Sequence, residues 1–200
     1  QEQAINIFMQ RRLNREPLAY ILGYRAFYGL TLRVRTEVMI PRSETELLVE
    51  HVLAMAMMGD EEEDMVIAEA GVGCGAISIN LAVHLPLTRI YATDLYPGAL
   101  DVARSNVTLH NVADRVTLLQ GDLLEPVPEP VNVIIANLPY VKSDLISRLQ
   151  PEIQWEPREA LDGGPDGLEV IRRLLYQSKG KLKEGGLILL EIDPEHVELL

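Results

Sequence analysis

The tetrapeptide that follows the apolar run at 131–136 carries the clearest chemical signal in the chain; it consists of Asn137, Leu138, Pro139 and Tyr140. A planar NH2 group needs two hydrogen-bond acceptors, which the Asn137 side-chain oxygen and the Leu138 carbonyl can supply. Pro139 would fix the backbone so that this carbonyl faces the site, and Tyr140 would lie against the flat face of the substrate. Such a clamp makes the nitrogen lone pair more available, so the pattern favours attack of that nitrogen on a sulfonium methyl group over a simple strand-end turn.

A glycine-rich segment, E-A-G-V-G-C-G at 69–75, follows a predicted strand and opens a predicted helix. Glycines allow a sharp turn and a close approach of a ligand to the backbone, and the helix N-terminus favours an anionic group. With Ala76 the segment also satisfies the dinucleotide pattern G-x-G-x-x-A, so it does not by itself choose between cofactors. Its cysteine is interpreted as a small filler rather than a nucleophile. The predicted cofactor-binding residues are Gly71, Val72, Gly73, Cys74 and Gly75.

Three further candidates follow the next two predicted strands. Asp94 comes directly after the run at 89–93, where a carboxylate can accept hydrogen bonds from both hydroxyls of a ribose; a helix cap before Pro97 is the competing interpretation. Asp122 could accept a hydrogen bond from an adenine amino group, with Leu123 packed on the ring, although a turn aspartate is equally plausible. Together these residues predict an adenosine-containing cofactor, and Asn137 is also expected to lie beside it as a cofactor-binding residue.

The elements that position these residues alternate between strands and helices, which is typical of an α/β fold with a mostly parallel sheet and helices on both faces. Ligands of such sheets bind beyond the carboxyl ends of the strands, which is where the candidate residues lie. Apolar runs and helical periodicity predict strands at 65–69, 89–93, 116–119, 131–136 and 187–192 and helices at 76–84, 97–109 and 168–178.

The N-terminal part of the sequence is predicted to contain one longer helix, over 43–58. Ser43 and Glu46 have the spacing of a capping box, and Gly59 would end the helix. The acidic run at 60–64 is interpreted as a solvated linker. Ahead of the helix we expect a helical and then turn-like stretch and a short hairpin, at 3–24 and 27–38.

The composition of the chain disfavours several classes of function and site. The 200 residues carry a formal net charge of −12, which argues against a general nucleic-acid binder because phosphate contacts need Lys and Arg. No apolar run reaches the ~20 residues needed to cross a bilayer. The single cysteine excludes an internal disulfide framework, so a reducing, cytoplasmic location is expected. The histidines lack the spacing of zinc ligands, and no metal is predicted; they are His51, His84, His110 and His196.

Several motifs, taken in order, resemble those of the bacterial protein-(glutamine-N5) methyltransferases that act on class I peptide chain release factors. The resemblance extends over almost the whole chain and includes the glycine segment, Asp94 and the Asn137–Tyr140 tetrapeptide. The additional matching segments are R-E-P-L-A-Y-I-L-G at 15–23, F-Y-G-L at 27–30, I-P-R-S-E-T-E at 40–46, E-P-R-E-A-L-D-G-G at 156–164 and D-G-L at 166–168.

This resemblance implies a Rossmann-like, class I S-adenosylmethionine-dependent methyltransferase fold. It implies that the glycine segment and Asp94 bind S-adenosylmethionine, that Leu123 lies against its adenine, and that Asn137 to Tyr140 hold the glutamine amide. The partner would be a release factor, with no membrane and no direct nucleic-acid contact. Residues 1–40 would be the remnant of a helical N-terminal domain with its linker and hairpin, and 41–200 the methyltransferase domain without its closing hairpin.

Three residues depart from the family pattern: Leu138 replaces a proline, Glu69 replaces an aspartate, and Leu123 stands where an aromatic residue is common. The N-L-P-Y spelling is typical of ribosomal RNA adenine dimethyltransferases, so an adenine-N6 methyltransferase of RNA or DNA stays open. A ribosomal-protein glutamine methyltransferase, an NAD-dependent oxidoreductase and a catalytically silent cofactor-binding module also stay open. Acidic runs at 60–64 and 152–159 would steer a basic partner.

Overall fold

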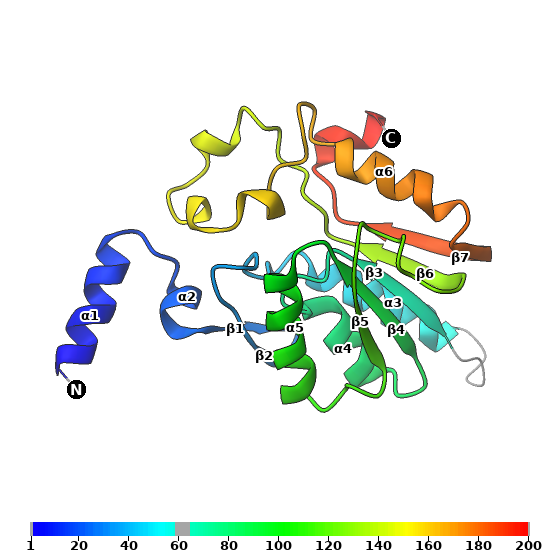
Figure 1. Cartoon of the computed structure of the whole chain (residues 1–200), viewed down its shortest axis with the longest axis horizontal. Helices are drawn as coiled ribbons and strands as arrows, with labels where there is room; N and C mark the ends of the chain where they lie inside the picture. The colour runs from blue at the N-terminus through cyan, green and yellow to red at the C-terminus, as the bar shows by residue number, and fades with distance from the viewer. Residues whose placement is uncertain (1, 59–64, 200) are drawn as a thin grey trace.

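The centre of the molecule is a five-stranded sheet in a computed structural model that describes residues 2–58 and 65–199 (Figure 1). It is formed by β3 (Val66–Ala70), β4 (Arg89–Asp94), β5 (Val116–Gln120), β6 (Val131–Ala136) and β7 (Leu182–Leu190). The strand order is β5-β4-β3-β6-β7, and neighbouring strands pair in parallel. The chain runs outward from β3 to β5 and then returns to the other side of β3. The strand order therefore reverses its direction at β3, with β4 on one side and β6 on the other. Open α/β sheets bind ligands at the carboxyl ends of the strands next to such a reversal.

The predicted parallel sheet is confirmed, but the predicted bounds of its last strand, 187–192, are wrong at both ends. The register of β7 against β6 shifts between Val131 and Val133. Gly185 lies in the corresponding part of β7 and has a φ of +73°, a backbone conformation that favours glycine. The first half of β7 therefore lacks the continuous apolar run by which a buried strand is recognised in a sequence.

Four helices cover the two faces of the sheet, namely α3 (Glu46–Met58), α4 (Ala76–His84), α5 (Pro97–Leu109) and α6 (Glu169–Ser178). The first three share a core with Ile67 of β3, whereas α6 shares a second core with Ala68 on the opposite face. Successive side chains of a strand point to opposite faces, so both cores need an apolar strand. Within the described residues, none of the helices has the length and apolar character needed to cross a membrane.

The N-terminal part consists of α1 (Glu2–Leu13), α2 (Leu18–Leu22) and an antiparallel hairpin of β1 (Tyr24–Phe27) and β2 (Leu30–Arg33). The predicted hairpin is present, but its predicted bounds, 27–38, are wrong, because its turn lies at Tyr28 and Gly29. Both turn residues have positive φ, 43° and 77°, as a two-residue hairpin turn requires. Phe27 and Leu32 are buried in the same core as α3 to α5. The proposed boundary at residue 40 stays a prediction.

The predicted capping box of α3 is also wrong. The Ser43 hydroxyl donates to the neighbouring Glu44 carboxylate over 3.1 Å, and no hydrogen bond of Ser43 Oγ to the start of the helix is present among the described residues. Glu46 Oε1 instead accepts a hydrogen bond from the backbone N–H of Tyr28 at 2.8 Å. The helix begins at Glu46, and the carboxylate of this residue binds the hairpin turn rather than capping the helix. The predicted helix end at Gly59 and the acidic run at 60–64 lie outside the described residues.

A long segment joins β6 to α6 and runs past the N-terminal part of the chain (Figure 1). Three short 3-10 helices, η1 (Ile146–Arg148), η2 (Ile153–Trp155) and η3 (Arg158–Ala160), interrupt it, and η4 (Pro194–Leu199) follows β7. Glu152 forms ion pairs with Arg12 and Arg15 at 2.9 and 2.8 Å. Glu156, which is buried, pairs with Arg42 at 2.6 Å. The segment is thereby tied to two separate N-terminal stretches.

A buried amide holds the hairpin against α5. Asn106 is fully buried; its Oδ1 accepts from the Arg33 N–H at 2.8 Å, and its Nδ2 donates to the Arg33 carbonyl at 2.9 Å. The same Nδ2 also donates to the carbonyl of Cys74 at 2.8 Å. One side chain therefore fixes both the hairpin and the glycine segment relative to α5.

The carboxyl group of Glu69, near the end of β3, is buried beneath the start of α4. It accepts hydrogen bonds from the hydroxyl and from the backbone N–H of Ser78, the latter at 3.0 Å. Desolvation raises the pKa of Glu69 to about 8, against the opposing effect of these hydrogen bonds. At neutral pH the folded chain therefore holds this group mainly in its uncharged form.

We expect Glu69→Gln to flatten the dependence of stability on pH. A carboxyl group with a raised folded-state pKa binds more protons when folded, so the free energy of unfolding of the parent falls as pH rises from about 4.5 to about 8, by up to ~1.4 kcal/mol per pH unit. Urea unfolding at several pH values measures this slope, with the exposed Glu125→Gln as control. An equal slope in parent and Glu69→Gln would show that Glu69 titrates normally.

Candidate active site

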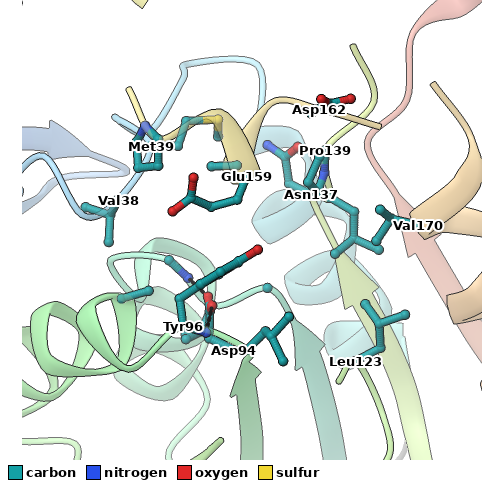
Figure 2. Close-up of a pocket in the computed structure, with 18 of the residues that line it drawn as sticks. Val38, Met39, Asp94, Tyr96, Leu123, Asn137, Pro139, Glu159, Asp162 and Val170 are labelled. Carbon is teal, nitrogen blue, oxygen red and sulfur yellow. Dashed lines mark hydrogen bonds between the residues drawn. The ribbon is translucent and has the colours of Figure 1, made fainter. Parts of the chain in front are cut away.

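A cavity of about 650 Å³ opens at the carboxyl edge of the sheet. Its floor comes from the ends of the strands, where Asp94 and Leu123 lie, and its far side carries Met39 and Glu159 (Figure 2). Asn137 borders the same cavity. The structure thus gathers residues from four strand ends and from the stretch before α3 around one space.

The glycine segment turns with three residues in the left-handed region, where φ is 78° at Gly71, 52° at Gly73 and 86° at Gly75. A Cβ at Gly75 would lie 2.7 Å from Ile79 Cδ1, whereas a Cβ at Gly73 would meet no atom within 4 Å. Gly73 therefore exposes its backbone to the cavity, as close approach of a ligand requires. Gly75 shapes the turn but does not itself line the cavity.

Cys74 and Val72 are buried within this segment. Desolvation raises the pKa of the Cys74 thiol to about 12, so the thiol stays protonated and is a poor nucleophile. The N–H of Val72 donates to the Thr93 carbonyl at 2.8 Å, which fixes the segment to the end of β4. Both residues nevertheless line the cavity, so their predicted contact with a cofactor stays a prediction.

Asp94 is oriented by two backbone N–H groups. Its Oδ2 accepts from Gly73 and its Oδ1 from Tyr96, each at 3.0 Å. Burial raises the pKa of Asp94, and these two bonds oppose the rise. Because each carboxylate oxygen can accept more than one hydrogen bond, Asp94 retains capacity to bind the hydroxyls of a ligand in the cavity.

Asp122 and Leu123 follow β5 and both line the cavity. The two oxygens of Asp122 accept hydrogen bonds from Arg173 and from Gln177, the latter at 3.2 Å, so the side chain is held by α6. Leu123 has a φ of +50°, uncommon for a leucine, and its carbonyl accepts from the Thr93 hydroxyl at 2.6 Å. This conformation leaves the buried Leu123 side chain at the apolar end of the cavity.

Asn137 directly follows β6, and its side-chain amide has one partner in the described chain. Asn137 Nδ2 donates to Thr45 Oγ1 at 3.0 Å, and Thr45 is buried and also lines the cavity. With the NH2 end engaged, the Oδ1 end is the hydrogen-bond acceptor left for a cavity ligand. Sequence reasoning missed Thr45 as a site residue, although the segment at 40–46 that contains it is recognisable as a motif.

The rest of the tetrapeptide divides into two parts. Leu138 and Pro139 line the cavity, and Leu138 packs close to the glycine segment, since a Cβ at Gly71 would lie 3.1 Å from Leu138 Cδ2. Tyr140 is not among the residues that line the cavity, and its expected contact with the substrate stays a prediction. Its hydroxyl points to Glu191 Oε1 at 3.4 Å, and burial raises its pKa.

The expected acidic steering surface at 152–159 is largely neutralised. Glu152 pairs with two arginines and Glu156 with Arg42, which leaves Glu159 as the carboxylate of this run that faces the cavity (Figure 2). Among the residues that the structure describes, no group of three or more His, Cys, Asp or Glu side chains is placed to hold a metal ion.

Comparison with known proteins places this geometry in a family. The family model described as Methyltransferase small domain matches residues 43–195. The chain is 44% identical to the release factor glutamine methyltransferase of Moorella thermoacetica, over 92% of the chain and 64% of the relative. It is 38% identical to the protein of the same name from Rhodopirellula baltica, over 97% of the chain and 67% of the relative.

Among solved structures, the ribosomal protein L11 methylase from Lactobacillus delbrueckii subsp. bulgaricus is similar in fold. The TM-score is 0.56 at 17% identity, and the match covers 88% of this chain and 75% of that one. This likeness supports the Rossmann-like class I methyltransferase fold. The chain spans about two thirds of the length of the curated relatives, and on sequence and fold together it belongs to the family of release factor glutamine methyltransferases.

Proposed function

We propose that this chain transfers a methyl group from S-adenosylmethionine to the side-chain amide nitrogen of a glutamine in a class I peptide chain release factor. The proposal rests on the hydrogen bonding of Asn137. Its NH2 end binds Thr45, so its side-chain oxygen is available to accept a hydrogen bond from a ligand in the cavity. The names of the relatives support the choice of substrate. The single, buried cysteine supports a reducing, cytoplasmic location.

The residues around the cavity fit S-adenosylmethionine. Gly73 offers open backbone to an anionic tail, and Asp94 offers carboxylate oxygens to the ribose hydroxyls. Leu123 and Val170 offer apolar side chains for the adenine (Figure 2), while Asp122 serves mainly to hold α6. When bound, the cofactor supplies an electrophilic methyl group on a sulfonium centre. Gly71, Val72, Cys74 and Gly75 shape the loop.

The glutamine carboxamide has two N–H hydrogens, and the chain offers two acceptors for them. Asn137 Oδ1 would accept one, and the Leu138 carbonyl the other, which orients the amide plane and its nitrogen. Pro139 limits the backbone freedom of this acceptor. Tyr140 acts from behind the tetrapeptide, where Glu191 holds its hydroxyl. Positioning of this kind can supply a large part of the rate enhancement of a two-substrate reaction.

An adenine-N6 methyltransferase is the second candidate, favoured by Leu138, because an exocyclic adenine amino group also presents a planar NH2 to the same acceptors. The net charge of −12 disfavours a nucleic-acid substrate. To separate the two, the chain is incubated with labelled cofactor and either a release factor or ribosomal RNA, and mass spectrometry locates the methyl group. We expect N5-methylglutamine in the release factor and no methyladenine; the reverse result would favour the second candidate.

Asp94→Ala should weaken binding of S-adenosylmethionine. Loss of a charged hydrogen-bond acceptor costs ~1.5–3 kcal/mol, which corresponds to roughly ten- to a hundred-fold in Kd. Calorimetry measures the change, with the exposed Asp114→Ala as matched control. Unchanged affinity in Asp94→Ala, or binding of NAD in place of S-adenosylmethionine by the parent, would contradict the assignment of the cavity.

Asn137→Ala should abolish most turnover while sparing cofactor affinity. By analogy with a lost oxyanion-hole donor, a pre-placed polar contact is worth ~2.7–4 kcal/mol, or ~10²–10³ in rate. Single-turnover methyl transfer and cofactor calorimetry separate the two effects, and the exposed Asn14→Ala serves as control. Turnover within a few-fold of the parent would mean that the amide oxygen of Asn137 does not hold the substrate.

Leu138→Pro should keep methyl transfer within about tenfold of the parent, equivalent to ~1.4 kcal/mol, because the carbonyl acceptor is retained. The variant should be less stable by about 0.5–3 kcal/mol, since the Leu138 side chain is only 4% exposed and packs near Gly71. Urea unfolding and turnover are measured on the same sample. A larger loss of activity with unchanged stability would identify Leu138 as a specific adaptation, as an adenine-N6 methyltransferase requires.

A further inference from the structure

The two ends of an asparagine side chain are nearly identical in shape but opposite in hydrogen bonding. A half-turn of the amide exchanges an acceptor for two donors. If the NH2 end of Asn137 faced the cavity, it would oppose a substrate NH2 group donor to donor. The proposed clamp therefore works only when one of the two orientations is fixed.

We propose that Thr45 is a positioning residue that holds the Asn137 side chain with its NH2 end bound and its oxygen turned to the cavity; this inference rests on and deepens the proposed function. Thr45 Oγ1 lies 3.0 Å from Asn137 Nδ2, although the two residues are 92 positions apart in the sequence. Thr45 is only 4% exposed, so little water can replace it as the acceptor for Asn137. Because a threonine hydroxyl can accept a hydrogen bond, Thr45 satisfies the NH2 end of Asn137 while the oxygen end stays available to donors in the cavity.

Thr45 can serve as a fixed reference because its own position is set independently of Asn137. Arg42 and the Ile40 N–H both bind the buried Glu156, at 2.6 and 3.2 Å. On the other side, Glu46 accepts from the Tyr28 N–H at 2.8 Å. The stretch that carries Thr45 is thus anchored at both flanks, to the β6–α6 segment and to the hairpin.

Thr45 directly precedes α3, but its hydroxyl does not act as a helix cap. A threonine that precedes a helix commonly accepts a hydrogen bond from an N–H of the first turn. Among the described residues, the hydrogen bond of Thr45 Oγ1 is the one from Asn137, while the N–H of Leu48 is satisfied by the Thr45 carbonyl at 3.1 Å. The hydroxyl therefore serves the active site rather than the helix.

Two substitutions separate the hydroxyl from the bulk of the side chain. Thr45→Val keeps the shape and removes the acceptor, and Thr45→Ser keeps the acceptor. We expect kcat of Thr45→Val to fall about tenfold or more, with cofactor affinity unchanged, and Thr45→Ser to stay within about threefold of the parent; tenfold corresponds to ~1.4 kcal/mol. Thr88→Val, at an equally buried threonine outside the cavity, is the matched control and should behave like the parent.

A second readout does not depend on activity. The side-chain NH2 signals of Asn137 in a nitrogen-15 NMR spectrum are assigned by their loss in Asn137→Asp. One of the two hydrogens should be protected from exchange with solvent in the parent and in Thr45→Ser, and unprotected in Thr45→Val. If this pattern holds but the chain methylates no release factor, the proposed function fails while the positioning role stands. Equal exchange in all three proteins would overturn the positioning role, as would full kcat in Thr45→Val.

Discussion

The candidate site depends on one constraint, that the carboxyl ends of parallel strands meet at the same edge of a sheet. Four residues, each at or just beyond the carboxyl end of a different strand, lie far apart in the sequence, yet the strand order brings them around one cavity: Gly73, Asp94, Leu123 and Asn137. That order requires β3 and β6 to be covered on both faces, so both strands are apolar throughout except for Glu69 and Asn132. The sheet therefore sets the spacing between the residues proposed to bind the cofactor and those proposed to hold the substrate amide.

A second set of contacts completes the site from outside the sheet. The stretch at 40–46 reaches the cavity through Thr45, and its hold on Glu156 fixes the long segment after β6. The cavity is thus closed by two segments that bind each other, and neither is part of the sheet. The sheet positions the residues proposed to bind the cofactor, while these two segments position the side chain proposed to hold the substrate amide. Loss of the Arg42–Glu156 pair would leave a buried carboxylate without its partner, an unfavourable change that would disturb both segments together.

Much of this arrangement is predictable from local patterns, because buried parallel strands are continuous apolar runs and the glycine turn has a recognisable sequence motif. β6 and the helix at 97–109 match the predictions residue for residue. Two departures from the predictions share a cause, because each involves a partner that is distant in sequence. Glu46 has the spacing of a capping residue, but its carboxylate binds the hairpin turn. Tyr140 is expected to lie against the substrate, but its hydroxyl donates to Glu191. Thr45 can be recognised as part of a motif, but its role cannot, because pairing it with Asn137 requires the fold.

The central claim is that the chain binds a carboxamide NH2 group between Asn137 Oδ1 and the carbonyl of Leu138. A crystal structure of the chain with S-adenosylhomocysteine and a glutamine-containing release-factor peptide tests it most directly. We expect the glutamine side-chain nitrogen to lie within ~2.7–3.2 Å of both oxygens, with Asn137 Nδ2 still bound to Thr45. A glutamine whose carbonyl oxygen, rather than its nitrogen, faces Asn137, or an Asn137 whose NH2 end faces the cavity, would contradict the account.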